Sequence, residues 1–131
     1  MTKKNKIPAA KTPQNKSVLD LSYLNECFGD DNILKINVIN VFIKESKLKT
    51  DALKISINEK NFTEIKKISH FLKSSFITMG LQCYAQLIEL EALGIQKGPI
   101  EKIRINFDEM ILIYIASIKE YTSLLKKLKN S

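Results

Sequence analysis

Between Ile100 and Leu128, apolar side chains recur at every third or fourth position, which is the spacing of one face of an α-helix. The row consists of Ile100, Ile103, Phe107, Met110, Tyr114, Ile118, Tyr121, Leu125 and Leu128. Pro99 precedes it and suits the first turn of a helix, where a missing N–H costs nothing. Lys126, Lys127 and Lys129 suit the other end, because cations stabilise a helix C-terminus. The row therefore predicts a long helix that packs against other helices.

A second segment shows the same periodicity after Asp30, Asp31 and Asn32, which supply a helix cap and early negative charge. We expect its inner row to be Leu34, Val38, Val41, Phe42, Leu48, Ala52 and Ile55. Residues 46–50 allow a bend or a break. The polar stretch from Asn58 to Asn61 ends this segment.

A third helix is predicted from Asn61, which forms a capping-box pattern with Glu64, to Gly80. Its apolar row is Phe62, Ile65, Ile68, Leu72, Ser75, Phe76 and Met79. A fourth helix is expected at about residues 82–93, before a loop from Gly94 to Gly98. Its inner row is Cys83, Tyr84, Leu87, Ile88 and Leu90.

A short helix at residues 19–28, ended by Gly29, precedes these four segments. No segment alternates apolar and polar residues as a half-buried strand does. Together the pattern predicts an all-α fold, namely an antiparallel four-helix bundle with a short additional N-terminal helix.

Positive charge is concentrated at the start of the chain. The formal net charge is +7, and residues 1–17 contain five lysines and no acidic residue. We expect residues 1–17 to form a disordered basic tail and residues 18–131 to form a single domain. A basic tail can bind nucleic acid or an anionic membrane, but this one lacks aromatic residues and an amphipathic pattern, which favours a solvated leader.

Several functional classes lack their sequence signals. Cys27 and Cys83 form no CxxC motif or zinc spacing, and we expect both to be buried free thiols. No apolar run is long enough to span a membrane, and the basic N-terminus is not followed by the apolar core of a signal peptide. We therefore expect a cytoplasmic protein that binds no metal or cofactor.

The chemistry-bearing feature is His70, the only histidine of the chain. At helical spacing it shares a face with Lys73, Ser74 and Ile77, roughly 140–200° from the apolar row, so it is predicted to face solvent. A neutral imidazole is a nucleophile near pH 7, because its ordinary pKa is about 6.5. Lys73 can attract a phosphoryl group held on its nitrogen, and Ser74 can donate a hydrogen bond. The competing interpretation is an ordinary surface histidine.

The run His70-Phe71-Leu72-Lys73-Ser74-Ser75, with Gly80 ten residues after the histidine, resembles the signature of histidine-containing phosphotransfer (HPt) domains, His-x-Leu-Lys-Gly-Ser. The resemblance implies a four-helix bundle from about residue 19 to residue 128, with the histidine on its second long helix. It implies that His70 is the phosphoacceptor, that Lys73 attracts the phosphoryl group, that Leu72 is a core anchor and that Gly80 ends the helix. Three positions depart from the pattern: Ser74 replaces a glycine, and Phe76 and Ile77 replace small residues.

The function implied is that of a phosphorelay intermediate, a phosphocarrier without turnover of its own. Its partners would be response-regulator receiver domains, which carry the Mg²⁺, and a hybrid histidine kinase. Lys66, Lys67, Phe71 and Ile77 are the expected contact residues. Two alternatives stay open: a scaffold or inhibitor module that binds a receiver or kinase without transfer, and a nucleic-acid binder that acts through its basic tail.

Overall fold

The computed structural model describes residues 17–130, and these residues form five α-helices and no strand. The helices are α1 (Ser22–Phe28), α2 (Asn32–Asn58), α3 (Phe62–Thr78), α4 (Tyr84–Gln96) and α5 (Ile100–Lys129). The predicted helical class is therefore confirmed. The predicted tail lies outside the described residues except for its last member, Ser17, whose hydroxyl bonds to the carboxylate of Glu120.

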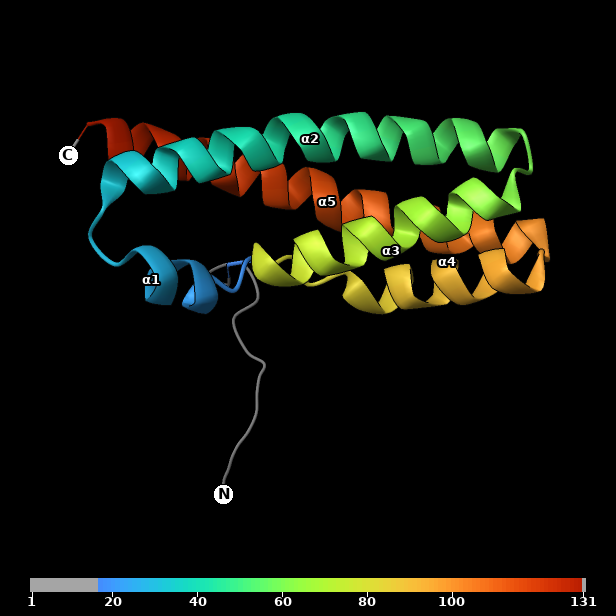
Figure 1. The fold of residues 1–131 in the computed structure, drawn as a ribbon. Helices are drawn as coiled ribbons and strands as arrows, with labels where there is room; N and C mark the ends of the chain where they lie inside the picture. The colour runs from blue at the N-terminus through green and yellow to red at the C-terminus, as the bar shows by residue number, and fades with distance from the viewer. Residues whose placement is uncertain (1–16, 131) are drawn as a thin grey trace, which may run out of the picture.

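The four longer helices lie alongside one another and alternate in direction along the chain (Figure 1). The helix α3 packs against α2 and α4, and α5 packs against the same two helices from the other side. The short α1 contacts the start of α2. In this arrangement α3 has one helix on each flank, and its outer face is left to solvent.

An aromatic cluster fills the interior between α2, α3 and α5. The ring of Phe42 meets those of Phe76 and Tyr121 edge-on, with centroids 5.8 Å apart in both pairs. Phe76 also stacks on Tyr114 at 5.6 Å. Both phenols are hydrogen-bonded, Tyr114 to the hydroxyl of Ser46 at 2.8 Å and Tyr121 to a backbone carbonyl of Met79. Such pairs contribute to the core beyond their buried area, because ring edges and faces attract one another.

The apolar rows predicted for α3 and α5 face this core. In α3 the residues Ile65, Leu72 and Phe76 are fully buried, and in α5 the residues Ile103, Met110 and Tyr121 are fully buried. Each of these helices has one apolar face, so its periodicity identified the buried side.

The row predicted for α2 is wrong at four positions. Leu34, Val41, Leu48 and Ile55 have exposed fractions of 43%, 56%, 62% and 57%. The buried side of α2 instead consists of Ile39, Phe42, Ser46, Thr50, Leu53, Ser56 and Ile57. The reason is that α2 has apolar residues on both faces, while three small hydroxyl residues stand on the inner one. The helix also continues without a break through residues 46–50, where Ser46 and Thr50 donate to carbonyls of the preceding turn.

The ends of α1 and α4 differ from the predictions. The helix α1 begins at Ser22 rather than residue 19, because Leu19 forms an isolated bridge with Leu81. The helix α4 runs to Gln96 and includes Gly94, which was predicted to begin the loop. A Cβ on Gly94 would lie 3.0 Å from the backbone nitrogen of Lys66, so this glycine lets α4 approach α3 closely.

Three side chains expected inside lie at the surface. Tyr84 and Ile88 of α4 are about half exposed, because α4 buries Leu87, Leu90 and Leu93 instead. Cys27 is also exposed, whereas Cys83 is buried and its thiol pKa is raised to about 12 by burial. Pro99 is the residue before α5 rather than part of its first turn.

Candidate functional site

The imidazole of His70 projects from the outer face of α3, and its side chain is 68% exposed. The neighbouring positions Ile68, Ser69 and Leu72 are buried and fix the rotation of the helix about its axis. Asn61 caps the start of α3, where its side chain accepts from the backbone N–H of Glu64. The helix that carries His70 is therefore held on its inner face and capped at its start.

A glutamate from the neighbouring helix holds the imidazole. Glu91 of α4 accepts a hydrogen bond from Nδ1 of His70 at 2.9 Å through one carboxylate oxygen. Its other oxygen accepts from Nζ of Lys73 at 2.8 Å. The Glu91 side chain is only 19% exposed, and the hydrogen bond from Lys73 lowers the pKa of its carboxyl, against the opposing effect of partial burial. The carboxylate is therefore ionised near neutral pH and can only accept.

This arrangement decides which ring nitrogen is available. Because the Glu91 carboxylate has no proton to donate, the proton of the neutral His70 ring must sit on Nδ1. The lone pair then sits on Nε2, the nitrogen at the far side of the ring from Glu91. The site can thus present a single nucleophilic nitrogen to an approaching electrophile.

Lys73 lies beside His70 on α3, but its ammonium is not free. It is bonded to Glu91, and its side chain is 28% exposed. The negative charge of Glu91 therefore offsets the positive charge of Lys73 while the imidazole carries no phosphoryl group. A phosphoryl group on the ring would compete with Glu91 for the ammonium.

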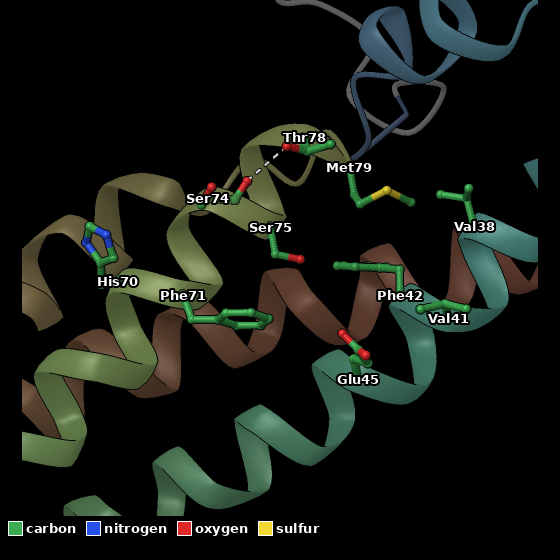
Figure 2. Close-up of a pocket in the computed structure, with 10 residues that line it drawn as sticks. All are labelled: Val38, Val41, Phe42, Glu45, His70, Phe71, Ser74, Ser75, Thr78 and Met79. Carbon is green, nitrogen blue, oxygen red and sulfur yellow. Dashed lines mark hydrogen bonds between the residues drawn. The ribbon is translucent and has the colours of Figure 1, made fainter.

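An apolar groove runs beside His70 between α2 and α3, with a volume of about 480 Å³. Figure 2 shows the imidazole at one end of this groove and residues of α2 along its opposite wall. Its lining consists of Val38, Val41, Phe42, Glu45, His70, Phe71, Ser74, Ser75, Thr78 and Met79. We call this the α2–α3 groove. Concave apolar surfaces of this size are candidate binding sites.

The structure brings some of the predicted contact residues together and separates others. Phe71 and Ser74 both line the α2–α3 groove next to His70, and Nζ of Lys49 lies 4.8 Å from the centroid of the Phe71 ring. Ile77 is exposed, but it lines a different hollow near α1, together with Tyr23.

The two predicted surface lysines lie on opposite flanks of the histidine. Lys66 lines a hollow beside Gly94 of α4. Lys67 pairs with Glu64 at 3.7 Å on an exposed surface, where such a pair contributes little to stability. The positive charge around His70 is therefore spread over both sides of α3.

Sequence reasoning missed Glu91 and the α2 wall of the groove. A signal for Glu91 exists in the chain: residues 70 and 91 are equally far from the turn around residues 80–81. In an antiparallel helix pair, two such residues lie at the same height. The α2 wall was missed because Val41 was predicted to be in the core.

Within residues 17–130, no three histidine, cysteine or acidic side chains are grouped so that they could hold a metal ion. None of the helices in that range is long and apolar enough to cross a bilayer.

No protein-family model, curated protein or solved structure matches this chain.

Proposed function

We propose that this protein is a phosphorelay intermediate in which Nε2 of His70 accepts a phosphoryl group from an aspartyl phosphate of one receiver domain and passes it to another. The observation that carries the proposal is the exposed imidazole whose Nδ1 is bonded to the Glu91 carboxylate. Within the same proposal, helices α2 to α5 form an antiparallel four-helix bundle of the HPt type. The ring of neighbours α2–α3–α4–α5 supports this architecture.

The proposed step conserves every atom. The Nε2 lone pair forms a bond to phosphorus while the bond from phosphorus to the aspartate oxygen breaks, and the aspartate leaves as a carboxylate. The proton on Nδ1 stays there, so the phosphorylated ring carries a positive charge next to Glu91. The Glu91 carboxylate stabilises that charge. A protonated ring is also the better leaving group in the return transfer, which suits a carrier.

Lys73 and Ser74 would act on the phosphoryl oxygens. The Lys73 ammonium, released in part from Glu91, can neutralise charge on the equatorial oxygens, which is the main catalytic demand of phosphoryl transfer. Ser74 lines the groove one helical turn after His70, and its hydroxyl would donate a hydrogen bond to the phosphoryl group (Figure 2). No cofactor is proposed for this chain, because the Mg²⁺ belongs to the receiver domain.

The α2–α3 groove is the proposed docking surface for the receiver. Phe71 and Val41 offer apolar contact beside the imidazole, while Lys66 and Lys67 would attract the acidic site of the receiver. We propose a small, transient interface, of the kind found in other signalling encounters. Receiver domains and a hybrid histidine kinase act in the cytoplasm, which is the compartment we propose.

The test is transfer from a labelled receiver. A receiver domain encoded near this chain would be phosphorylated with labelled phosphate, purified from its kinase and mixed with this protein. We expect label on this protein that is stable in alkali and lost in acid, and we expect His70→Gln to abolish it. Phosphorus–nitrogen coupling in ¹⁵N-histidine-labelled protein would assign the bond to Nε2. Label on the His70→Gln variant, or a bond to Nδ1, would contradict the proposal.

A second candidate function is a scaffold or inhibitor module that binds a receiver without transfer. Ser74 favours it, because a hydroxymethyl group occupies space beside the ring where the HPt signature has glycine. The Ser74→Gly variant separates the two functions. If the wild type binds a receiver without accepting label and Ser74→Gly accepts it, the protein is a binding module. If both accept label, it is a carrier.

A further inference from the structure

The excess positive charge of this protein lies at the two ends of its chain. Residues 1–16 contain five lysines and no acidic residue, and residues 119–131 contain four lysines and one glutamate. The stretch between them, residues 17–118, has 12 basic and 13 acidic side chains, a net charge of −1. The formal net charge of +7 therefore comes from two segments that are far apart in the sequence.

The fold brings these two segments together. The hydroxyl of Ser17 bonds to the carboxylate of Glu120, and the backbone N–H of Val18 donates to the same carboxylate at 2.9 Å. These contacts fix the point at which residues 1–16 join the fold, beside the last third of α5. The lysines of that part of α5 are exposed and have no ion-pair partner within residues 17–130. We call residues 1–16 and these lysines the cationic end; the lysines are Lys119, Lys126, Lys127 and Lys129.

Exposed apolar side chains lie at the same height as these lysines. Ser46 of α2 bonds to Tyr114 of the antiparallel α5 at 2.8 Å, so residues equally far from this contact lie level with each other. Ile33 precedes Ser46 by 13 residues. Lys127 follows Tyr114 by the same number, so it lies level with Ile33. Ile33 is 76% exposed, the most of any large apolar side chain in residues 17–130, and the adjacent Leu34 is 43% exposed.

Two classes of polyanion have the charge to meet this surface, namely nucleic acids and anionic membranes. Nucleic-acid recognition uses arginine at base edges and aromatic stacking on single strands. Residues 1–16 and 122–131 contain no arginine and no aromatic residue. Aliphatic side chains beside lysines suit a bilayer instead, because they gain from burial at the boundary between headgroups and acyl chains. The side chains of Ile33 and Leu34 therefore favour the membrane.

We propose that the cationic end, together with Ile33 and Leu34, binds the surface of an anionic membrane. The lysines supply the attraction to acidic headgroups, and the two aliphatic side chains enter the headgroup region. The basic tail alone is expected to be solvated, and α5 and α2 provide the second group of lysines and the apolar contact that it lacks. Carboxylates of α1 and of the start of α2 oppose the attraction, but lysines outnumber them. The binding is peripheral, reversible and weakened by salt.

Membrane binding at this end leaves the histidine accessible. Nζ of Lys49 on α2 lies 4.8 Å from the centroid of the Phe71 ring, so His70 is nearly level with Lys49. Lys49 is 16 residues from Ile33 along α2, which is about 24 Å at 1.5 Å per residue. A membrane against the cationic end would therefore leave the imidazole uncovered. The proposal does not rest on phosphotransfer, and its test uses no receiver.

Vesicle sedimentation with the full chain is the first test. Sucrose-loaded vesicles of phosphatidylcholine and phosphatidylserine are compared with vesicles of phosphatidylcholine alone. We expect the protein to pellet with the anionic vesicles at low salt and to stay in solution with the neutral ones. At about 1 M salt, where the screening length is ~3 Å, we expect it to be released. No pelleting with anionic vesicles, or equal pelleting with neutral ones, would overturn the proposal.

Charge variants of the full chain test whether both segments take part. Glutamine replaces the five lysines of residues 1–16 in one variant, and Lys126, Lys127 and Lys129 in another. Each variant should lower the partition coefficient into anionic vesicles by about tenfold or more, because each lysine near an anionic surface adds to binding. The matched control replaces three exposed lysines at the opposite end of the bundle, Lys60, Lys97 and Lys102. An equal loss in the control, or no loss in the α5 variant, would reject the cationic end as a joint surface.

Ile33 distinguishes the membrane from nucleic acid. Ile33→Ser should weaken vesicle binding several-fold, whereas Leu112→Ser, at a similarly exposed leucine in the middle of α5, should not. The same proteins are titrated into a fluorescent DNA duplex at equal ionic strength, and anisotropy measures binding. Circular dichroism verifies that every variant is folded. Saturable duplex binding at protein concentrations that leave the vesicles unbound, or Ile33→Ser without effect on vesicle binding, would overturn the membrane assignment.

Discussion

The neighbouring helices α2 and α3 distribute their apolar residues in different ways. The helix α3 has one buried apolar face and an outer strip with a histidine, a lysine and a serine, whereas α2 has apolar residues on both faces. The outer surface of α3 carries side chains that can react or form hydrogen bonds. The outer surface of α2 carries apolar side chains that can contact another molecule. The difference teaches that an apolar row belongs to the core only where no second row competes for that place.

The largest expected effect is on the free energy of unfolding, and it compares one leucine from the inner face of α2 with one from the outer face. Leu53 is fully buried and Leu48 is 62% exposed. We expect Leu53→Ala to lower the free energy of unfolding by about 2–5 kcal/mol, because it leaves a cavity in the core. Leu48→Ala should change it by less than about 0.5 kcal/mol. Urea denaturation at low protein concentration would measure both. Equal losses would mean that the two faces of α2 are not distinct.

A second experiment tests Glu91 of α4, which bonds to His70 and Lys73 on the outer face of α3. Glu91→Gln removes the negative charge that holds Nδ1–H and Lys73, and we expect the rate of phosphoryl transfer to fall about tenfold or more, which corresponds to ~1.4 kcal/mol. The ¹⁵N chemical shifts of the imidazole should show a mixture of tautomers. The control is Glu89→Gln, an exposed carboxylate on the same helix. A normal rate with an unchanged tautomer would remove Glu91 from the site.

The two predicted apolar contacts can be compared in the same way. Phe71 lines the α2–α3 groove, and Ile77 lines the hollow near α1. Phe71→Ala should weaken receiver binding several-fold, since a truncated aromatic anchor at an interface typically costs about 1 kcal/mol or more. Ile77→Ala should have little effect. Titration of the receiver by calorimetry gives both affinities, and the reverse order would place the docking surface nearer to α1.

The smallest effect concerns pH. The hydrogen bond from Lys73 lowers the pKa of Glu91 below its value in the unfolded chain, so the pair stabilises the fold when the carboxylate is ionised. That contribution is fully present above the ordinary glutamate pKa of about 4.3, and it is lost as the pH falls through the lowered folded value. The stability difference between the wild type and Lys73→Met should therefore shrink in acid. A difference that does not change with pH would argue against the ion pair.

The sequence alone predicted most of what depends on a single helix. The capping residues Asn61 and Asp31, the buried rows of α3 and α5, and the outward position of His70 all follow from spacing along one chain segment. The inner face of α2 did not follow, because Ser46 and Thr50 are buried through hydrogen bonds that no apolar pattern reveals.

The partner of the histidine required tertiary information. Glu91 lies 21 residues from His70 and meets it only because α3 and α4 fold back on each other. The packing of Gly94 against Lys66 is what allows that close approach. The HPt assignment itself stays a prediction that the transfer experiment tests.

The two residues that follow α3, Met79 and Gly80, accept hydrogen bonds from other parts of the fold. The Tyr121 hydroxyl bonds to the carbonyl of Met79, and the N–H of Asp20 donates to the carbonyl of Gly80 at 2.8 Å. Gly80 has a φ of +78°, and a Cβ there would lie 1.8 Å from the oxygen of Asp20, so the contact leaves no room for another residue type. These contacts oppose movement of α3 along its axis. It follows that the position of the His70 imidazole along the helix axis is held by these contacts. A partner molecule must therefore move to the imidazole, rather than the imidazole to the partner.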